Sequence, residues 1–208
     1  MTDAEDRPST SHERASGRPW SASYLPGPAP WDIGAPQPAV AELIAAGAFT
    51  GEVLDAGCGT GDNTVALAAH GLQVVGIDVA EPALTIARRK AADHGLDIEF
   101  TLADALRLDR LHRRFDTILD SALFHTFDST EQSRYATGLT TITTPGATVY
   151  LLCFSDTGPN PGPHPVTRTA ITTAFASPAW QIATIEPAHL RTRFDEASPA
   201  WLATIHRR

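Results

Sequence analysis

The stretch VLDAGCGTGDNTVALAAHG, residues 53–71, decides the fold of this protein. Its apolar beginning predicts a β-strand, and its alanine-rich end predicts an α-helix closed by a glycine. Between the two lie Gly57, Gly59 and Gly61. Glycine lets the chain turn tightly and bring bare backbone against a ligand, and the N–H groups that begin a helix favour an anion such as a phosphate or a carboxylate. A tight turn alone needs one glycine, so three of them predict a ligand-binding loop.

Strands and helices alternate outward from this loop. The expected strands cover residues 52–57, 73–78, 96–102, 115–122 and 144–154, and the expected helices cover residues 39–47, 62–70, 81–95, 129–142 and 167–176. Ser129 and Gln132 are expected to form the capping box of the fourth helix. The alternation predicts parallel strands with helices on both faces, a Rossmann-like doubly wound α/β sheet. Two last strand-like segments, residues 180–186 and 200–207, predict an antiparallel hairpin at one edge.

The composition predicts one domain. The 208 residues, of which 42% are apolar, suffice for a sizeable core, and no apolar run is long enough for a membrane span. Residues 1–19 are polar and lack the apolar core of a signal peptide, so we expect a cytoplasmic protein with a disordered tail over 1–19 and a single domain over 20–208. The net charge of −8 argues against a nucleic-acid partner and fits an uncharged or cationic small molecule better. Cys58 and Cys153 form no CxxC pair, so neither a disulfide framework nor a metal site is expected.

Residues 20–40 combine prolines with Trp20, Tyr24 and Trp31. So many prolines exclude a regular helix or strand, yet the aromatic rings need an apolar environment. We expect this segment to lie as a lid across the mouth of a pocket.

Two acids follow predicted strands at the edge where ligands bind in such a sheet. Asp78 ends the second strand, roughly 20 residues after the first glycine of the loop, where an acid accepts hydrogen bonds from ribose hydroxyls. Asp104 follows the third strand, and it either accepts a hydrogen bond from an adenine amino group or caps the next helix.

The segments VLDAGCGTGDNT, VVGIDVAEPALTIARRKA, FTLADAL and FDTILDSALFHTF resemble, in order and spacing, the motifs of class I S-adenosylmethionine-dependent methyltransferases. This resemblance covers most of residues 53–154 and implies a seven-stranded sheet whose last strand is antiparallel, S-adenosylmethionine as cofactor and S-adenosylhomocysteine as product. It implies that the glycine loop holds the methionine part, that Asp55 reaches its amino end through the turn or a water, that Asp78 binds the ribose, and that Asp104 with Ala105 binds the adenine. The expected cofactor site comprises Trp31, Asp55, Gly57, Cys58, Gly59, Gly61, Asn63, Asp78, Val79, Asp104, Ala105 and Ser121.

Outside that core the chain looks closest to the branch of thiopurine and thiol/halide methyltransferases. PWDIGAPQP, residues 30–38, resembles their Trp-containing segment over the cofactor, and GPNPGPHPVTRTAITTAF, residues 158–175, resembles their Gly/Pro loop before the last helix. The resemblance implies a small, often heterocyclic acceptor that is methylated at N, O or S. It leaves the acceptor itself and the oligomeric state open.

The segment SALFHTF, residues 121–127, is implied to lie over the reacting centre. His125 has the only side chain there that titrates near neutral pH, so it is either a general base or a positioning residue. Trp31 and Phe124 are the candidates for stabilising the sulfonium cation through their rings. For Trp31 the alternative is simple burial. Acceptor contacts are expected from Trp20, Tyr24, Phe124, His125 and His164.

Two other functions are compatible with a glycine loop and an acid after the second strand. A nicotinamide-dependent oxidoreductase has the fingerprint GxGxxG, whereas this loop reads GxGxG, with Asp62 and Asn63 where the third glycine would fall. The other alternative is a non-catalytic protein that binds S-adenosylmethionine, because a fold does not determine a function.

Overall fold

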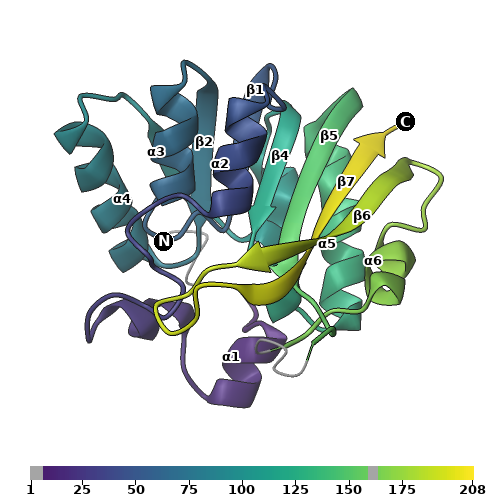
Figure 1. The fold of residues 1–208 in the computed structure, drawn as a ribbon, viewed down its shortest axis with the longest axis horizontal. Coiled ribbons are helices and arrows are strands. Elements are labelled where there is room, and N and C mark those ends of the chain that lie inside the picture. The colour runs from purple at the N-terminus through teal and green to yellow at the C-terminus, as the bar shows by residue number, and fades with distance from the viewer. Residues whose placement is uncertain (1–6, 159–163) are drawn as a thin grey trace.

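Seven strands form one sheet in the order β3-β2-β1-β4-β5-β7-β6 in the computed structural model, which describes residues 7–158 and 164–208 (Figure 1). The strands are β1 (Glu52–Ala56), β2 (Gln73–Asp78), β3 (Glu99–Leu102), β4 (Phe115–Ser121), β5 (Thr143–Phe154), β6 (Trp180–Leu190) and β7 (Ser198–Arg207). The pairs among β1 to β5 are parallel, whereas β7 is antiparallel to both β5 and β6. The predicted doubly wound sheet with an antiparallel last strand is therefore confirmed, as is the hairpin at its edge.

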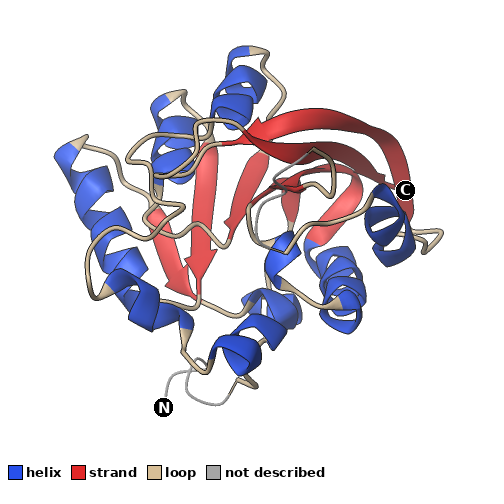
Figure 2. Ribbon diagram, turned by 60° about the horizontal axis from the view of Figure 1, so that its bottom comes forward, coloured by secondary structure: helices blue, strands red, loops and turns tan. Residues whose placement is uncertain are grey.

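Helices cover both faces of the sheet (Figure 2). They are α1 (Ser11–Ser16), η1 (Trp20–Tyr24), α2 (Pro38–Ala45), α3 (Asp62–Ala69), α4 (Glu81–Asp93), η2 (Ala105–Leu111), η3 (Phe124–Thr126), α5 (Ser129–Ile142) and α6 (Arg168–Ala174), where η marks a 3₁₀ helix. The helices α2 and α3 pack on one face, and α5, α6 and η2 pack on the other. Over residues 7–158 and 164–208 none of these helices has the length and apolar character needed to cross a membrane.

Alternate residues of the central strands face opposite sides of the sheet. Val53 of β1 packs with α2 and α3, whereas its neighbour Leu54 packs with α5 and η2. In β4, Leu119 packs on the side of α2 and α3, and Ile118 packs on the side of α5 and η2. All four side chains are fully buried. Because both faces are covered, these strands read as nearly continuous apolar runs.

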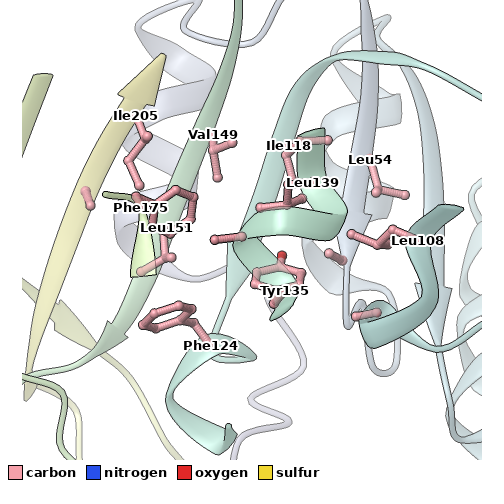
Figure 3. Close-up of a cluster of buried hydrophobic side chains, with 14 of the residues drawn as sticks. Leu54, Leu108, Ile118, Phe124, Tyr135, Leu139, Val149, Leu151, Phe175 and Ile205 are labelled. Carbon is pink, nitrogen blue, oxygen red and sulfur yellow. The ribbon is translucent and has the colours of Figure 1, made fainter. Parts of the chain in front are cut away.

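The larger core lies between the sheet and α5. Tyr135, Leu139 and Ile142 have the spacing of one helix face, and all three are buried. Figure 3 shows Tyr135 and Leu139 gathered there with side chains from η2 and from the strands. This packing holds the end of β4, from which the segment 121–127 begins.

The N-terminal segment differs from the expected disordered tail. Residues 1–6 lie outside the described part of the chain, but α1 follows soon after them, with a capping box between Thr10 and Glu13. The backbone N–H of Ser11 donates to Oε1 of Glu131 on α5 at 2.8 Å. Polar contacts with a distant helix, rather than apolar burial, hold this segment, which is why its composition predicted disorder.

The capping box of α5 is shifted by one residue from the predicted pair Ser129 and Gln132. Asp128 is the N-cap, and its carboxylate accepts the N–H of Glu131 at 2.9 Å. The Glu131 carboxylate accepts the N–H of Asp128 at 3.2 Å in return. Asp128 takes the cap because the helix begins at Ser129, one residue earlier than the predicted pairing requires.

Candidate functional site

A cavity of about 420 Å³ opens at the carboxyl ends of the parallel strands. Of the site residues predicted from the sequence, its wall includes Trp20, Tyr24, Trp31, Gly57, Cys58, Gly59, Asn63, Asp78, Val79, Ala105, Ser121, His125 and His164. Asp55, Gly61, Asp104 and Phe124 are not on that wall. The cavity lies where ligands bind in doubly wound sheets.

The glycine loop and the end of β2 form one hydrogen-bonded unit. The N–H groups of Gly57 and Cys58 both donate to the carbonyl oxygen of Ile77, at 2.8 and 2.9 Å. The N–H of Gly59 donates to Oδ2 of Asp78 at 2.9 Å. The loop is therefore held against the strand that carries the predicted ribose ligand.

Gly61 acts behind the cavity wall. Its φ of +80° lies in the left-handed region, and a Cβ built there would come within 2.8 Å of the Ala87 Cβ on α4. A larger residue would be both strained and obstructed. Gly61 thus serves the turn and the packing of α4 rather than lining the cavity.

Asp78 presents its carboxylate to the cavity while the backbone holds it in place. Oδ1 accepts the N–H of Ala80 at 2.8 Å, and Oδ2 accepts the N–H of Gly59. Desolvation raises the pKa of Asp78 above its ordinary value, against the lowering effect of these backbone donors. Each carboxylate oxygen has a second lone pair, so the group can also accept ligand hydroxyls.

Asp55 lies beneath the loop and does not reach the cavity. It is fully buried, and its Oδ2 accepts the hydroxyl of Thr64 on α3 at 2.6 Å. Burial raises the pKa of Asp55 to about 7. Asp55 is not among the residues that line the cavity.

Asp104 caps η2, as one of the two sequence interpretations expected. Its Oδ1 accepts the N–H of Leu106 at 2.9 Å. Its Oδ2 is buried and has no hydrogen-bond donor among the described residues, the Arg107 Nε lying 4.0 Å away. Ala105, next in the chain, lines the cavity.

The aromatic segment, residues 20–40, contributes the rings of Trp20, Tyr24 and Trp31 to the cavity wall. The indole N–H of Trp31 donates to the Tyr24 hydroxyl at 3.1 Å, and the two rings meet edge to face. Trp20 lies edge-on to Trp31, with ring centroids 5.7 Å apart. Burial raises the pKa of Tyr24, so its phenol stays protonated at any physiological pH.

Lys90 on α4 connects this segment to the end of the glycine loop and the start of α3. This contact was not predicted from the sequence. Its Nζ lies 2.7 Å from Asp62 Oδ2 at the start of α3 and 3.0 Å from the Thr60 hydroxyl. Asp32, beside Trp31, lies 3.8 Å away. No local pattern links a lysine on α4 to these acids, because the contact exists only once α3 and α4 pack together.

The turn between β6 and β7 is a second unforeseen part of the wall. Leu190, Arg191, Thr192, Phe194 and Ser198 line the cavity. One signal was present in the sequence: in a final antiparallel hairpin, the turn falls at the same edge as the carboxyl ends of the parallel strands. Phe194 is 84% exposed, which is unusual for a large apolar side chain.

The far end of the cavity is lined by polar and aromatic groups. The Ser121 hydroxyl is buried and has no hydrogen-bond partner among the described residues. His125 is 7% exposed, and its Nδ1 accepts the backbone N–H of Phe154 at 3.4 Å. Desolvation, helped by His164 and His12, lowers the pKa of His125 to about 3. A histidine this weakly basic is uncharged at neutral pH.

His12, on α1, is a wall residue that the sequence analysis assigned to the disordered tail. Its Nδ1 lies 3.1 Å from Nε2 of His164, and its ring stacks on Trp20 with centroids 4.3 Å apart. His164 comes from the Gly/Pro loop, of which residues 159–163 lie outside the described residues. Three imidazoles from distant parts of the chain therefore border one end of the cavity.

Phe124 corrects the prediction that it contacts the acceptor or the cation. It is fully buried, with ring centroids 6.4 Å from Tyr135 and 6.2 Å from Phe175 (Figure 3). Successive residues of the short helix η3 point in different directions, so Phe124 enters the core while His125 borders the cavity. The sequence alone does not show which of the neighbours Phe124 and His125 enters the core and which borders the cavity.

No group of His, Cys, Asp and Glu side chains that could hold a metal ion is found within the described ranges. Cys58 has a thiol whose pKa is raised by desolvation and by the carboxylates of Asp55 and Asp78. It is therefore a poor nucleophile.

The side-chain oxygen of Asn63 on α3 accepts the N–H of Gln37 at 2.9 Å, which adds a further contact between α3 and the aromatic segment 20–40.

Comparisons with known proteins agree with this arrangement. A family model described as a methyltransferase domain matches residues 53–146. The chain is 36% identical over 170 residues to the 2-heptyl-1-hydroxyquinolin-4(1H)-one methyltransferase of Mycobacteroides abscessus, covering 80% of this chain and 74% of that protein. It is 30% identical over 145 residues to a probable thiol methyltransferase of Arabidopsis thaliana, covering 68% of this chain and 63% of that protein.

A solved structure described as “Conversion of a Disulfide Bond into a Thioacetal Group during Echinomycin Biosynthesis” superposes with a TM-score of 0.79. The two sequences are 37% identical, and the match covers 86% of this chain and 84% of the other. The seven-stranded sheet, the glycine loop bound to the end of β2 and these similarities lead to one conclusion. The chain belongs to the class I S-adenosylmethionine-dependent methyltransferases.

Proposed function

We propose that this protein transfers a methyl group from S-adenosylmethionine to an N, O or S atom of a small heteroaromatic acceptor. The observation that carries the proposal is the unit formed by the glycine loop and Asp78. It joins bare backbone and a carboxylate at the switch point of the sheet, where an adenosyl compound needs both.

The cavity floor has groups that suit the parts of that cofactor. The backbone of Gly57 and Gly59 suits the methionine part, and Asp78 suits the ribose hydroxyls. Ala105 suits the adenine ring, whereas Asp104, whose Oδ2 has no hydrogen-bond partner among the described residues, lies behind the wall. When bound, the cofactor supplies a methyl group on a sulfonium, which is already a competent electrophile.

The protein's own contribution is then positioning and exclusion of water. Trp31 and Tyr24 cover the cavity, and Lys90 holds their segment down. Residues 20–40 act as the lid in this proposal, and Asp55 keeps a structural role beneath the loop. The site residues Cys58, Asn63, Val79 and Ser121 complete the wall around the cofactor.

The acceptor class rests on the far end of the cavity and on the relatives. That end has aromatic rings and imidazoles rather than a cluster of acids or lysines. The mycobacterial relative is named for a hydroxyquinolone and the plant relative for a thiol. A flat heteroaromatic ring with one nucleophilic heteroatom suits both the lining and the relatives.

The test has two arms. Isothermal titration calorimetry with S-adenosylhomocysteine should show binding at one site, and S-adenosylmethionine with a radiolabelled methyl group should label hydroxyquinolones, thiophenols or N-heterocycles. Binding without labelling of any acceptor would favour the non-catalytic alternative. Absence of binding would refute the proposal outright.

A further inference from the structure

The hydrogen bond to His125 determines which of its ring nitrogens carries the proton. Nδ1 accepts the backbone N–H of Phe154 at 3.4 Å. A nitrogen that accepts a hydrogen bond must present its lone pair, so the proton of the neutral ring is on Nε2. Phe154 ends β5, and its ring lies 4.6 Å from the imidazole, which fixes the orientation of His125 from two directions.

The Nε2–H group of His125 is available to a ligand. No described residue forms a hydrogen bond with it, and the side chain borders the cavity. A histidine that acts as a base has the opposite arrangement, in which Nδ1–H donates to an acid and Nε2 offers its lone pair. In the present arrangement His125 can donate a hydrogen bond to the acceptor, but its exposed nitrogen has no lone pair with which to remove a proton.

The other titratable groups near His125 have hydrogen-bond or ion-pair partners of their own. His12 and His164 face it from α1 and from the loop before α6, and they bond to each other at 3.1 Å. Asp128 follows η3, but its carboxylate caps α5 and pairs with Arg14 at 3.4 Å. Desolvation and the two histidines hold the pKa of His125 at about 3, which agrees with the neutral tautomer.

The carboxylates on the cavity wall are engaged elsewhere. Asp62 and Asp32 lie around the ammonium of Lys90, at 2.7 and 3.8 Å. Asp78 accepts two backbone N–H groups at the end of β2. Because these acids are bonded to Lys90 or to backbone N–H groups, none of them forms the hydrogen bond that would orient His125 as a base.

We infer that His125 is a hydrogen-bond donor to an acceptor that enters already deprotonated, so that the enzyme selects heteroaromatic acceptors whose N–OH, O–H or S–H group ionises readily. This inference rests on the proposed function. The proton leaves to solvent before binding. The acceptor heteroatom then supplies the electron pair of the new bond to the methyl carbon, and the pair of the broken carbon–sulfur bond stays on sulfur. A negative heteroatom becomes neutral, a sulfonium becomes a thioether, and no protein group gains or loses a proton.

The first test reads the tautomer directly and needs no substrate. Two-dimensional ¹H–¹⁵N spectra of the imidazole rings distinguish Nε2–H from Nδ1–H. His70 and His94 are internal references of the opposite kind, because their Nδ1 atoms lie 2.8 Å from the carbonyl oxygens of Ala66 and Lys90. We expect Nε2–H for His125 with no titration between pH 5 and 8. An Nδ1–H tautomer, or a titration near pH 6.5, would overturn the inference.

The second test uses 1-hydroxyquinolin-4(1H)-ones whose ring substituents grade the acidity of the N–OH group. The pH at which kcat/KM reaches half its maximum should follow the pKa of each acceptor, in the wild type and in His125→Phe alike. Loss of the donor should lower kcat/KM roughly 10-fold. His70→Phe, at an exposed site away from the cavity, is the matched control and should leave kcat/KM unchanged.

A binding readout separates this inference from the proposed function. With S-adenosylhomocysteine present, the absorbance of a bound hydroxyquinolone should show the anion at a lower pH than in water, and His125→Phe should abolish that shift. A half-maximal pH that is the same for every acceptor and vanishes in His125→Phe would identify His125 as a base and sink the inference. Failure of all acceptors to react despite cofactor binding would instead refute the proposed function, and the tautomer measurement would still stand.

Discussion

Gln37 and Arg191 exchange two hydrogen bonds of 2.9 Å across the mouth of the cavity. The Gln37 side-chain amide donates to the backbone carbonyl of Arg191, and the backbone N–H of Arg191 donates to the Gln37 side-chain oxygen. Beside them, the N–H of Arg193 donates to the Pro30 carbonyl at 2.8 Å. The lid and the turn between β6 and β7 are therefore one covering layer, although some 150 residues separate them along the chain.

Removing the Gln37 side chain should loosen that layer. Gln37 is 6% exposed, so Gln37→Ala leaves two backbone groups of Arg191 without their partner. We expect the free energy of unfolding to fall by about 1–3 kcal/mol in urea denaturation. Gln73→Ala, at an exposed position, is the control and should stay within about 0.5 kcal/mol of the wild type. Equal losses in the two variants would mean that the Gln37 bonds contribute no stability.

Asp78→Asn should weaken binding of S-adenosylhomocysteine. The amide keeps the size of the side chain but loses the charge and one of the acceptor oxygens. Calorimetry should show a loss of about 1–3 kcal/mol, which is roughly a 5- to 150-fold rise in Kd. Asp97→Asn changes an exposed acid outside the cavity and should bind normally. An unchanged Kd for a folded Asp78→Asn variant would remove Asp78 from the ribose site.

Gly61 and Gly71 provide a matched pair for the packing of α3 and α4. Their φ angles are +80° and +82°, but a Cβ meets the Ala87 Cβ at 2.8 Å at Gly61 and nothing within 4 Å at Gly71. Gly71→Ala should cost only the left-handed strain, about 1–2 kcal/mol. Gly61→Ala should cost about 1–3 kcal/mol more, because Ala87 must also move. Thermal unfolding of both variants measures the difference, and similar losses would show that α4 yields without cost.

The raised pKa of Asp55 predicts that the stability of the folded protein falls between about pH 4 and 7. Burial raises its pKa to about 7 in the folded state, far above the value of 3.8 for a free side chain. Between about pH 4 and 7 the folded state therefore binds more protons than the unfolded state, and its stability falls as the pH rises. Fully buried Asp120, whose pKa is also raised to about 7, adds to the same trend.

The variant Asp55→Asn removes one of these two titrations. Its stability relative to the wild type should increase from pH 4 to pH 7, by more than about 1 kcal/mol, since each pKa unit is about 1.4 kcal/mol. Urea denaturation at pH 4, 5.5 and 7 measures this difference. Asp97→Asn should show no such gain, and a flat difference for Asp55→Asn would contradict the raised pKa.

The sheet and the cavity floor could be predicted from the sequence because their signals are local. An apolar strand, a glycine turn and a helix occupy one short stretch, and Asp78 follows directly on the next strand. Such a pattern determines its own geometry, because parallel strands bring their carboxyl ends to one edge. The succession of strands and helices along the chain and the placement of Gly57, Gly59 and Asp78 could therefore be predicted.

The covering layer and the acceptor end could not be predicted in the same way. His12 lies on α1, which a hydrogen bond from Ser11 to Glu131, 120 residues away, holds against α5. Phe124 and His125 are neighbours in the sequence, but the 3₁₀ helix places the first in the core and the second on the cavity wall. Contacts of this kind depend on tertiary packing, which composition and periodicity do not encode.

The direction of β7 has a practical consequence for handling the enzyme. This strand starts at Ser198, on the rim of the cavity, and runs antiparallel to β5, so it finishes at Arg207 on the opposite border of the sheet (Figure 1). A fluorescent reporter or a resin tether attached behind Arg208 would project away from the opening. Immobilising the molecule by that terminus should keep the site open to solutes, so captured protein can be screened against compound collections.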